Sequence, residues 1–297
     1  MKILHIDNRS RSSYGITQGL NKISHVVNDV KYLNQVDLII VSDVPSDELL
    51  NLIDKNKLWH KTIHYDYRDT LKIEEISNKC LRSFKRSIIN RNNNEVIEDL
   101  YKIKHISHCA LDEYYLNNFE KQYDIGCFFD INDPKHLGIR RFNLIQTLSS
   151  LNIENSLIGK STGKKQEARL AIFNENKDNC FYEFLKFQSY CKIIFSAQPS
   201  HCEGDNRTWE AMASGGLVFL DKMNSYYVNK LIDEKHCIFY DALDINSILE
   251  AYDKAKFYLK NEDKRLKIAI NGFDFVKKYH TSIERAKQIY KSFKVFL

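Results

Sequence analysis

A segment in which two apolar runs enclose a polar loop and a short helical stretch most constrains the fold of this chain. The first run, at residues 193–195, leads into residues 201–221, which read HCEGDNRTWEAMASGGLVFLD and end in the second run. A strand, a loop, a helix stopped by two glycines and a further strand predict a βαβ unit. In parallel sheets built from such units, ligands bind at the carboxyl ends of the strands. The segment therefore predicts an α/β fold with a ligand site at this loop.

Two charged side chains mark the expected start of this helix. Arg207 and Glu210 are three residues apart and therefore share one face of its first turn. A helix N-terminus favours an anion, so an arginine for phosphate and a carboxylate for sugar hydroxyls suit a nucleotide diphosphate. The alternative is an exposed ion pair worth a few tenths of a kcal/mol. We assign a nucleotide-sugar site to this pair and to the residues around it, which are Gly204, Asp205, Asn206 and Thr208.

The sequence around this pair resembles the donor-binding segment of GT-B glycosyltransferases, most closely the group 1 family and its spore-maturation-protein-like branch. The resemblance rests on Arg-x-x-Glu-Ala-Met-Ala-Ser-Gly-Gly, followed by a short apolar strand and Asp. It implies that Glu210 hydrogen-bonds the ribose hydroxyls of the nucleotide. The family separates its two motif glutamates by seven residues, whereas six lie between Glu203 and Glu210, and the family spacing falls on Cys202. The role of the first glutamate is therefore not transferred to Glu203.

The length of 297 residues suits two modest domains, each with its own core. Two successive runs of alternating strand and helix patterns predict two Rossmann-like, doubly wound α/β domains facing a cleft, as the GT-B resemblance also implies. We place an acceptor-side domain at residues 1–118 and a nucleotide-sugar domain at 119–281. Residues 282–297 form a helix that the resemblance expects to pack on the first domain. Further helices are expected at residues 12–27, 73–90 and 226–233.

The loop that follows the apolar sequence DIGCFF is a second candidate part of the donor site. Gly138 can let the backbone approach a ligand, and Arg140 and Arg141 can supply positive charge. Lys135 and His136 precede them in the same loop. The structural alternative is that the two arginines begin a helix, with one side chain exposed and the other paired with a carboxylate.

In the first domain, His64, Asp66 and Asp69 stand at or just after the end of a predicted strand that reads KTIHYDY. An inverting transferase needs a general base for the acceptor hydroxyl, and each of the three can serve as one. A retaining transferase mainly needs stabilisation of the leaving phosphate, which Arg207 can provide. Structural roles for the three first-domain residues fit the sequence equally well, and the stereochemistry stays open.

Composition limits the partners and the cellular setting. The net charge of +5 is compatible with anionic substrates, a membrane surface or nucleic acid and selects none of them. Seven scattered cysteines without a C-x-x-C pair fit a reducing cytoplasm. No apolar run approaches the ~18 residues of a membrane-spanning helix. We therefore expect a cytoplasmic protein without a transmembrane segment and leave peripheral contact with a membrane open.

The leading hypothesis is a hexosyltransferase-like enzyme that moves a sugar from a nucleotide-diphosphate sugar to a hydroxyl of a glycan, a lipid or a small molecule. Two alternatives stay open: transfer to modified DNA bases, which we place below a glycan or lipid acceptor, and a non-catalytic nucleotide-sugar-binding GT-B module. Asp130 and Asp133 resemble a metal-binding D-x-D motif, but two residues separate them, so a turn role is expected. The enzyme is expected to need no metal and no cofactor beyond its co-substrate.

Overall fold

The structure is a computed structural model of the chain, which forms two compact units. Unit 1 comprises Met1–Cys109 and His280–Leu297, and unit 2 comprises Ala110–Tyr279. The sequence predicts domain boundaries after residues 118 and 281. In the structure, the boundaries between the two units lie after residues 109 and 279. The described residues are 1–6, 11–68, 72–86, 88–90, 95–96, 103–116, 120–129, 138–160, 185, 187–198, 204–223 and 229–295.

The strands of unit 1 are β1 Lys2–Ile6, β2 His25–Val27, β3 Leu38–Ser42, β4 Thr62–Asp66, β5 Arg82–Lys85, β6 Ile89–Asn90, β7 Glu95–Val96 and β8 Ile103–His105. Six of them form a parallel sheet in the order β2-β1-β3-β4-β5-β8, and β6 pairs with β7 in antiparallel fashion. Strands β2 and β3 flank β1, so the strand order reverses between β1 and β3. This switch point is where sheets of this kind bind ligands.

Helices cover both faces of this sheet. They are α1 Arg11–Asn21, η1 Val30–Gln35, α2 Asp47–Lys55, η2 Trp59–Lys61, α3 Ile76–Lys79 and α11 Ser282–Lys294. Alternate strand residues point to opposite faces: Ile3 packs in one core with Ile289 of α11, and Leu4 packs in the other with Ile53 of α2. Every side chain of β3 is accordingly buried, as expected for a parallel strand covered on both sides.

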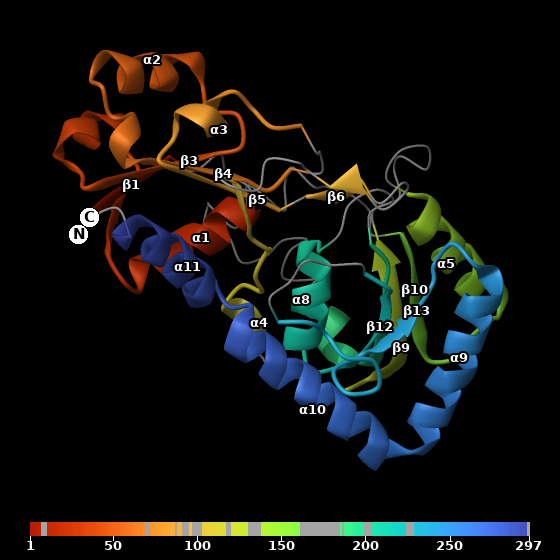
Figure 1. Cartoon of the computed structure of the whole chain (residues 1–297). Coiled ribbons are helices and arrows are strands. Elements are labelled where there is room, and N and C mark those ends of the chain that lie inside the picture. Colours follow the sequence, from red (N-terminus) through yellow and green to blue (C-terminus); the bar gives the residue numbers. More distant parts are fainter. Residues whose placement is uncertain are drawn as a thin grey trace. The chain divides into compact units, whose positions relative to one another are not determined.

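The C-terminal helix belongs to unit 1, where α11 packs against α1 (Figure 1). Gly19 of α1 permits this close approach, because a Cβ atom at this position would overlap the carbonyl oxygen of Ser282. Three side chains of α11, Ala286, Ile289 and Phe293, lie in the core of the unit. The helix expected at residues 282–297 therefore supplies part of the packing of the N-terminal sheet.

The strands of unit 2 are β9 Tyr123–Phe129, β10 Ser156–Lys160, β11 Cys191–Ser196, β12 Leu217–Asp221 and β13 Ile238–Tyr240. They form a parallel sheet in the order β10-β9-β11-β12-β13. The switch point of this sheet lies between β9 and β11. Both units thus share the doubly wound strand order, and the predicted fold class of two Rossmann-like α/β domains is confirmed.

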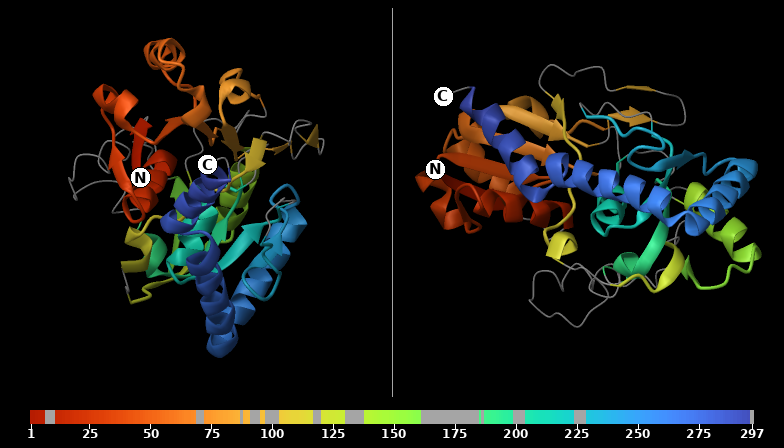
Figure 2. Two further views of the ribbon diagram at one scale, coloured as in Figure 1. Left: turned by 60° about the vertical axis from the view of Figure 1, so that its left-hand side comes forward. Right: turned by 90° about the horizontal axis from the view of Figure 1, so that it is seen from below.

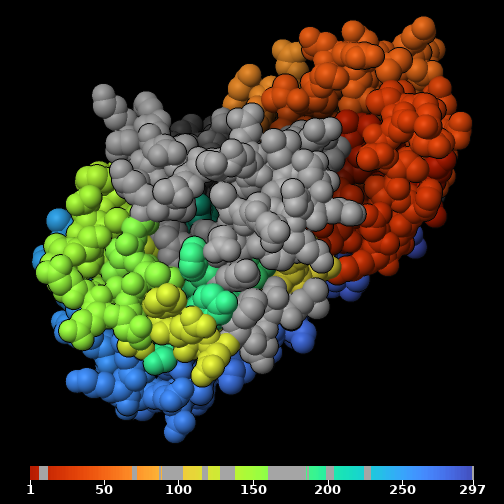
Figure 3. Space-filling model, turned by 180° about the vertical axis from the view of Figure 1, so that it is seen from behind, coloured from red at the N-terminus to blue at the C-terminus, as the bar shows by residue number. Residues whose placement is uncertain are grey.

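The helices of unit 2 are α4 Glu113–Leu116, α5 Ile139–Ser150, α8 Asn206–Ala213, α9 Ile245–Lys260 and α10 Glu262–Tyr279. Helices α9 and α10 meet at Asn261 and form a V in the left view of Figure 2. Helix α5 packs on α9, with Leu144 and Ile248 in one core, and α10 packs on α8. The outer side of α5 lies at the surface of the unit (green in Figure 3), where Phe142 is 37% exposed.

Three sequence predictions of helices differ from the structure in whole or in part. The helix expected at residues 12–27 ends at Asn21 and is followed by β2. The helix expected at residues 73–90 is replaced by the short α3 and by β5, in which the charged Lys85 is buried. The described part of the third segment, residues 229–233, contains no helix. The buried side chain of Lys85 in β5 forms an ion pair with a residue that is distant in sequence, which offsets the cost of burying its charge. Because a charged residue occupies this buried position, the sequence does not show the apolar pattern of a buried strand.

The described cysteines behave as core residues. Cys80, Cys109, Cys127, Cys191 and Cys237 are free thiols and buried. Burial raises the pKa of Cys80 and Cys191 to about 12, so both stay protonated at neutral pH. Among the described residues, no helix combines the length and apolar character needed to cross a membrane.

Candidate functional site

Helix α8 begins after a turn at Gly204 and Asp205. Gly204 in this turn has a φ of 74°, a left-handed conformation that glycine adopts without strain. Asp205 is the N-cap residue, and its carboxylate accepts a hydrogen bond from the Thr208 N–H at 3.3 Å. Two residues expected to bind nucleotide, Gly204 and Asp205, thus shape the helix start.

A buried glutamine ties this turn to the sheet. Gln198 follows β11 and is 0% exposed. Its Oε1 accepts from the Gly204 N–H at 2.9 Å, and its Nε2 donates to Thr208 Oγ1 at 2.8 Å. Its backbone N–H donates to Asp221 Oδ2 at 3.3 Å, which links the turn to the end of β12. Sequence reasoning missed Gln198, although a polar residue directly after an apolar strand is a signal that could have identified it.

Two arginines at the start of α5 are buried in ion pairs with carboxylates of unit 2. Arg140 Nη1 lies 2.9 Å from Asp221 Oδ1 and 3.2 Å from Asp241 Oδ1. Arg141 donates to the carboxylate of Asp205, the N-cap of α8. Each arginine is 7% exposed, so neither is the exposed residue of the structural alternative. The two arginines thus connect the start of α5 to the end of β12 and to the start of α8. Direct contact of either arginine with a ligand stays a prediction.

Arg207 and Glu210 lie at the first and second turns of α8. The Arg207 side chain is 16% exposed, and its Nη1 lies 3.7 Å from Asp205 Oδ2. Glu210 is 0% exposed, which is rare for a carboxylate and inconsistent with an ordinary surface ion pair. Asn206 is the first residue of α8, with its side-chain oxygen buried, and Gly138 is the N-cap of α5. Unit 2 therefore brings the predicted donor residues together around two helix starts.

His64 on β4 uses both ring nitrogens inside unit 1. Its Nε2 donates to the Asp43 carbonyl oxygen at 2.7 Å, which leaves Nδ1 to accept from the Ser77 hydroxyl at 2.9 Å. The side chain is 0% exposed, and burial lowers its pKa. This neutral histidine, with both nitrogens engaged, favours a structural role over that of a general base.

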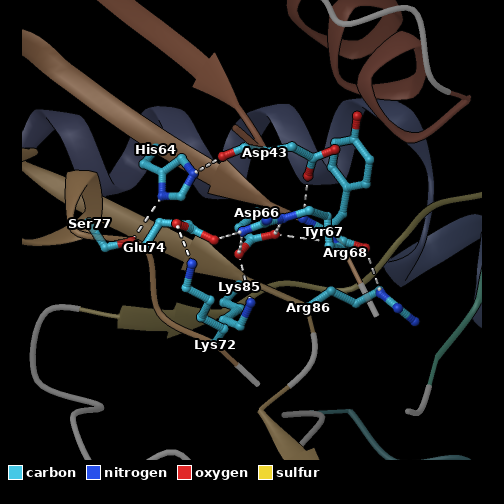
Figure 4. A network of polar contacts seen from close by, with 10 residues as sticks. All are labelled: Asp43, His64, Asp66, Tyr67, Arg68, Lys72, Glu74, Ser77, Lys85 and Arg86. Atoms are coloured by element: carbon cyan, nitrogen blue, oxygen red, sulfur yellow. Dashed lines mark hydrogen bonds and ion pairs between the residues drawn. The ribbon is translucent and has the colours of Figure 1, made fainter. Parts of the chain in front are cut away.

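Asp66 at the end of β4 is held by two cations (Figure 4). Lys85 Nζ lies 2.6 Å from Oδ2, and Arg68 donates to both carboxylate oxygens at 3.0 Å. Arg68 also pairs with Glu74 at 2.8 Å. Burial raises the pKa of Asp66, but the hydrogen bonds of Arg68 and the charge of Lys85 outweigh it, and the net pKa is lowered. A carboxylate held in this way is a weak base.

Seven residues considered from the sequence lie outside the described part of the chain: Asp69, Asp130, Asp133, Lys135, His136, Cys202 and Glu203. A role of Asp69 as a base therefore stays a prediction. The described residues contain no group of three or more His, Cys, Asp or Glu side chains that could hold a metal ion.

Comparison with known proteins relates this chain to glycosyltransferases. Residues 151–291, which include the whole of β11, α8 and β12, match a family model described as glycosyl transferase-like. No match to the chain was found among curated proteins. The predicted GT-B fold is confirmed by the solved structures below, and the family match supports the prediction of a glycosyltransferase. The spore-maturation-protein-like branch stays a prediction.

Solved structures share the fold over nearly the whole chain. An alpha-glucosyltransferase, solved with UDP and a 13-mer DNA containing a HMU base, has a TM-score of 0.69 at 10% identity, covering 99% of each chain. A glycosyltransferase from Rickettsia africae has a TM-score of 0.64 at 12% identity, with 99% of this chain and 98% of that chain covered. Alr3699/HepE from Anabaena, in complex with UDP and glucose, has a TM-score of 0.61 at 11% identity, with 99% and 100% covered.

Proposed function

We propose that the chain transfers a sugar from a uridine diphosphate sugar to an acceptor hydroxyl. The observation that carries this proposal is the start of α8, where Arg207 and the fully buried Glu210 lie one turn apart on a capped helix. This helix lies within the segment that matches the glycosyl transferase-like family. The choice of uridine follows from two structures of the same fold, which were solved with UDP.

Each part of this site has a physical role in the proposed reaction. Glu210 accepts hydrogen bonds from the ribose hydroxyls. A hydrogen bond to a charged acceptor is about twice as strong as one to a neutral acceptor. Arg207 neutralises the charge that develops on the leaving diphosphate. Gln198, Arg140 and Asp221 hold the turn before α8 through buried hydrogen bonds and ion pairs, so that the binding groups are positioned before the ligand arrives.

We expect Glu210→Gln to weaken the binding of UDP-glucose roughly ten- to hundredfold, because a charged hydrogen bond contributes about 1.5–3 kcal/mol. Glutamine keeps the size of the side chain and removes its charge. Calorimetric titration of UDP-glucose into the wild type and the variant measures the change. Glu250→Gln, an exposed carboxylate of α9, is the matched control and should bind normally. Equal affinity of the Glu210 variant and the wild type would remove Glu210 from the site.

A DNA acceptor is the second candidate, and two observations favour it. The alpha-glucosyltransferase with the same fold was solved with DNA. Unit 1 has 21 Lys and Arg against 15 Asp and Glu, a net charge of +6, whereas unit 2 has 23 against 24, a net charge of −1. Duplex DNA with hydroxymethylated bases should then bind with an affinity that falls steeply as salt rises. The absence of binding at 50 mM salt would leave a glycan or lipid hydroxyl as the acceptor.

Three finer points belong to the same proposal. The transfer needs no metal ion or other cofactor, as the GT-B resemblance implies, and it takes place in the cytoplasm. The protein is a catalyst rather than a nucleotide-sugar-binding module, since Arg207 and Glu210 are both retained at the start of α8. Release of UDP from UDP-glucose over many turnovers distinguishes a catalyst from a binding module.

A further inference from the structure

Three charged side chains of unit 2 meet at the start of α8. Arg141 of α5 donates from Nη2 to Asp205 Oδ2, and Arg207 Nη1 lies 3.7 Å from the same oxygen. The side chains of Arg141, Asp205 and Arg207 are 9%, 14% and 16% exposed, so water weakens their attraction less than it would at an open surface. One carboxylate oxygen thus faces two guanidinium groups, and one of these belongs to the phosphate-binding residue of the proposed function.

The two oxygens of this carboxylate have different tasks. Asp205 is the N-cap of α8, and its Oδ1 accepts from the Thr208 N–H at 3.3 Å. Its Oδ2 makes the contacts with Arg141 and Arg207. Asparagine and serine cap helices about as well as aspartate does. The cap therefore needs a side-chain oxygen at this position, whereas the negative charge acts on the two arginines.

A negative charge beside Arg207 opposes the binding of a diphosphate. Carboxylate and phosphate oxygens are both acceptors for a guanidinium, so Asp205 competes with the ligand for Arg207 and also repels it. When the bond between the sugar and the terminal phosphate breaks, its electron pair stays on the phosphate oxygen. A terminal phosphate with a second pKa of about 6 then carries additional negative charge at neutral pH. The repulsion is therefore larger for the product UDP than for UDP-glucose.

We propose that Asp205 is a counter-charge that weakens the binding of UDP more than that of UDP-glucose and so favours release of the product. This inference rests on the proposed function and deepens it, because Arg207 binds the diphosphate and Asp205 limits how tightly it is bound. Release of product limits the turnover of many enzymes. A site with Arg207 and without the charge of Asp205 would keep its product for longer.

Asp205→Asn is the variant that tests the proposal. It removes the charge and keeps a side-chain oxygen that can accept from the Thr208 N–H. We expect the affinity for UDP to rise about tenfold, which is 1.4 kcal/mol, and the affinity for UDP-glucose to rise less. The affinity for uridine, which has no phosphate, should stay unchanged. Calorimetric titration measures the three affinities, and product inhibition by added UDP should become stronger to match.

Two further variants show whether the effect is specific. In the Arg207→Ala background, Asp205→Asn should raise the affinity for UDP less than it does in the wild type, because the charge acts mainly through Arg207. Asp244→Asn is the matched control. Asp244 is the N-cap of α9, where its carboxylate accepts from the Asn246 N–H at 2.9 Å, and it is exposed. Loss of this charge should leave the affinity for UDP unchanged.

An affinity for UDP that is unchanged or lower in Asp205→Asn, at the wild-type melting temperature, would overturn the proposal. An equal gain in the Arg207→Ala background would do the same. If asparagine disturbs the packing of Arg141, Asp205→Ser is the second variant. Structural damage weakens both ligands alike, so in a destabilised variant an unchanged ratio of the affinities for UDP and UDP-glucose counts against the counter-charge. Failure of the proposed function has a separate signature, because the wild-type chain would then bind neither ligand.

Discussion

Replacing Asp66 by asparagine is expected to lower the free energy of unfolding by about 3–5 kcal/mol, which is the usual cost of removing one partner of a buried ion pair. Lys85 would keep its charge with a side chain only 3% exposed, and Arg68 would lose a partner for two of its hydrogen bonds. Urea denaturation followed by circular dichroism measures the change. The double variant Asp66→Asn with Lys85→Met should recover part of the loss, because it removes the unpaired buried charge.

A surface ion pair provides the control for this experiment. Asp253→Asn breaks the pair of Asp253 with Lys256, whose side chains are 71% and 50% exposed, and should change stability by less than about 1 kcal/mol. The pKa of Asp66 is lowered in the folded state, so its contribution is present above the ordinary aspartate pKa and is lost as pH falls through the folded value. The difference in stability between the wild type and Asp66→Asn should therefore begin to shrink below about pH 3.9 and disappear only below the folded pKa of Asp66. A loss under 1 kcal/mol at pH 7 would contradict the buried-pair interpretation.

Replacing Arg207 by alanine is expected to slow UDP release from UDP-glucose about 10²–10³-fold, the effect of removing one group that stabilises charge in a transition state. Arg207 lies at the start of α8, where its guanidinium and the backbone N–H groups of the helix both favour the leaving diphosphate. The affinity for UDP should fall with the turnover, while the affinity for uridine should barely change. Initial rates and parallel titrations with uridine and UDP measure the three quantities.

The pattern of losses distinguishes two explanations of this result. If Arg207→Ala weakened uridine and UDP equally, the start of α8 would have collapsed, and the phosphate role would be wrong. Lys230→Ala, which removes an exposed cation elsewhere in unit 2, should leave turnover unchanged. A slowdown in this control would indicate a general charge effect rather than a specific contact.

The start of α8 could be predicted from sequence because its signals are local. The apolar run, the polar loop, the N-cap Asp205 and the two glycines occupy consecutive positions, and each acts on its neighbours. The partners of that helix start could not be predicted. Arg140 reaches Asp221 across 81 positions of sequence, and the hydrogen bonds of Gln198 with Gly204 and Thr208 depend on the folded loop.

Unit 1 shows where local reasoning fails. The pattern around Lys85 predicted a helix rather than a buried strand, and a lysine is almost never buried unless it is paired. Its partner Asp66 lies 19 positions earlier, on a neighbouring strand. His64 lies on a strand, as predicted, but in the middle of β4, and its hydrogen-bond partners determine what it can do.

The discontinuous make-up of unit 1 has a consequence for biosynthesis. The ribosome completes residues 1–109 long before α11 emerges, and at about 5–20 residues per second the delay is roughly 10–35 s. During this time the apolar face of the sheet that includes Ile3 and Ile40 lacks Ile289 and Phe293. Unit 2 is continuous and can bury its own core first. We therefore expect unit 2 to fold before α11 completes the core of unit 1. In the interval, the exposed apolar face of unit 1 should make the nascent chain depend on chaperones.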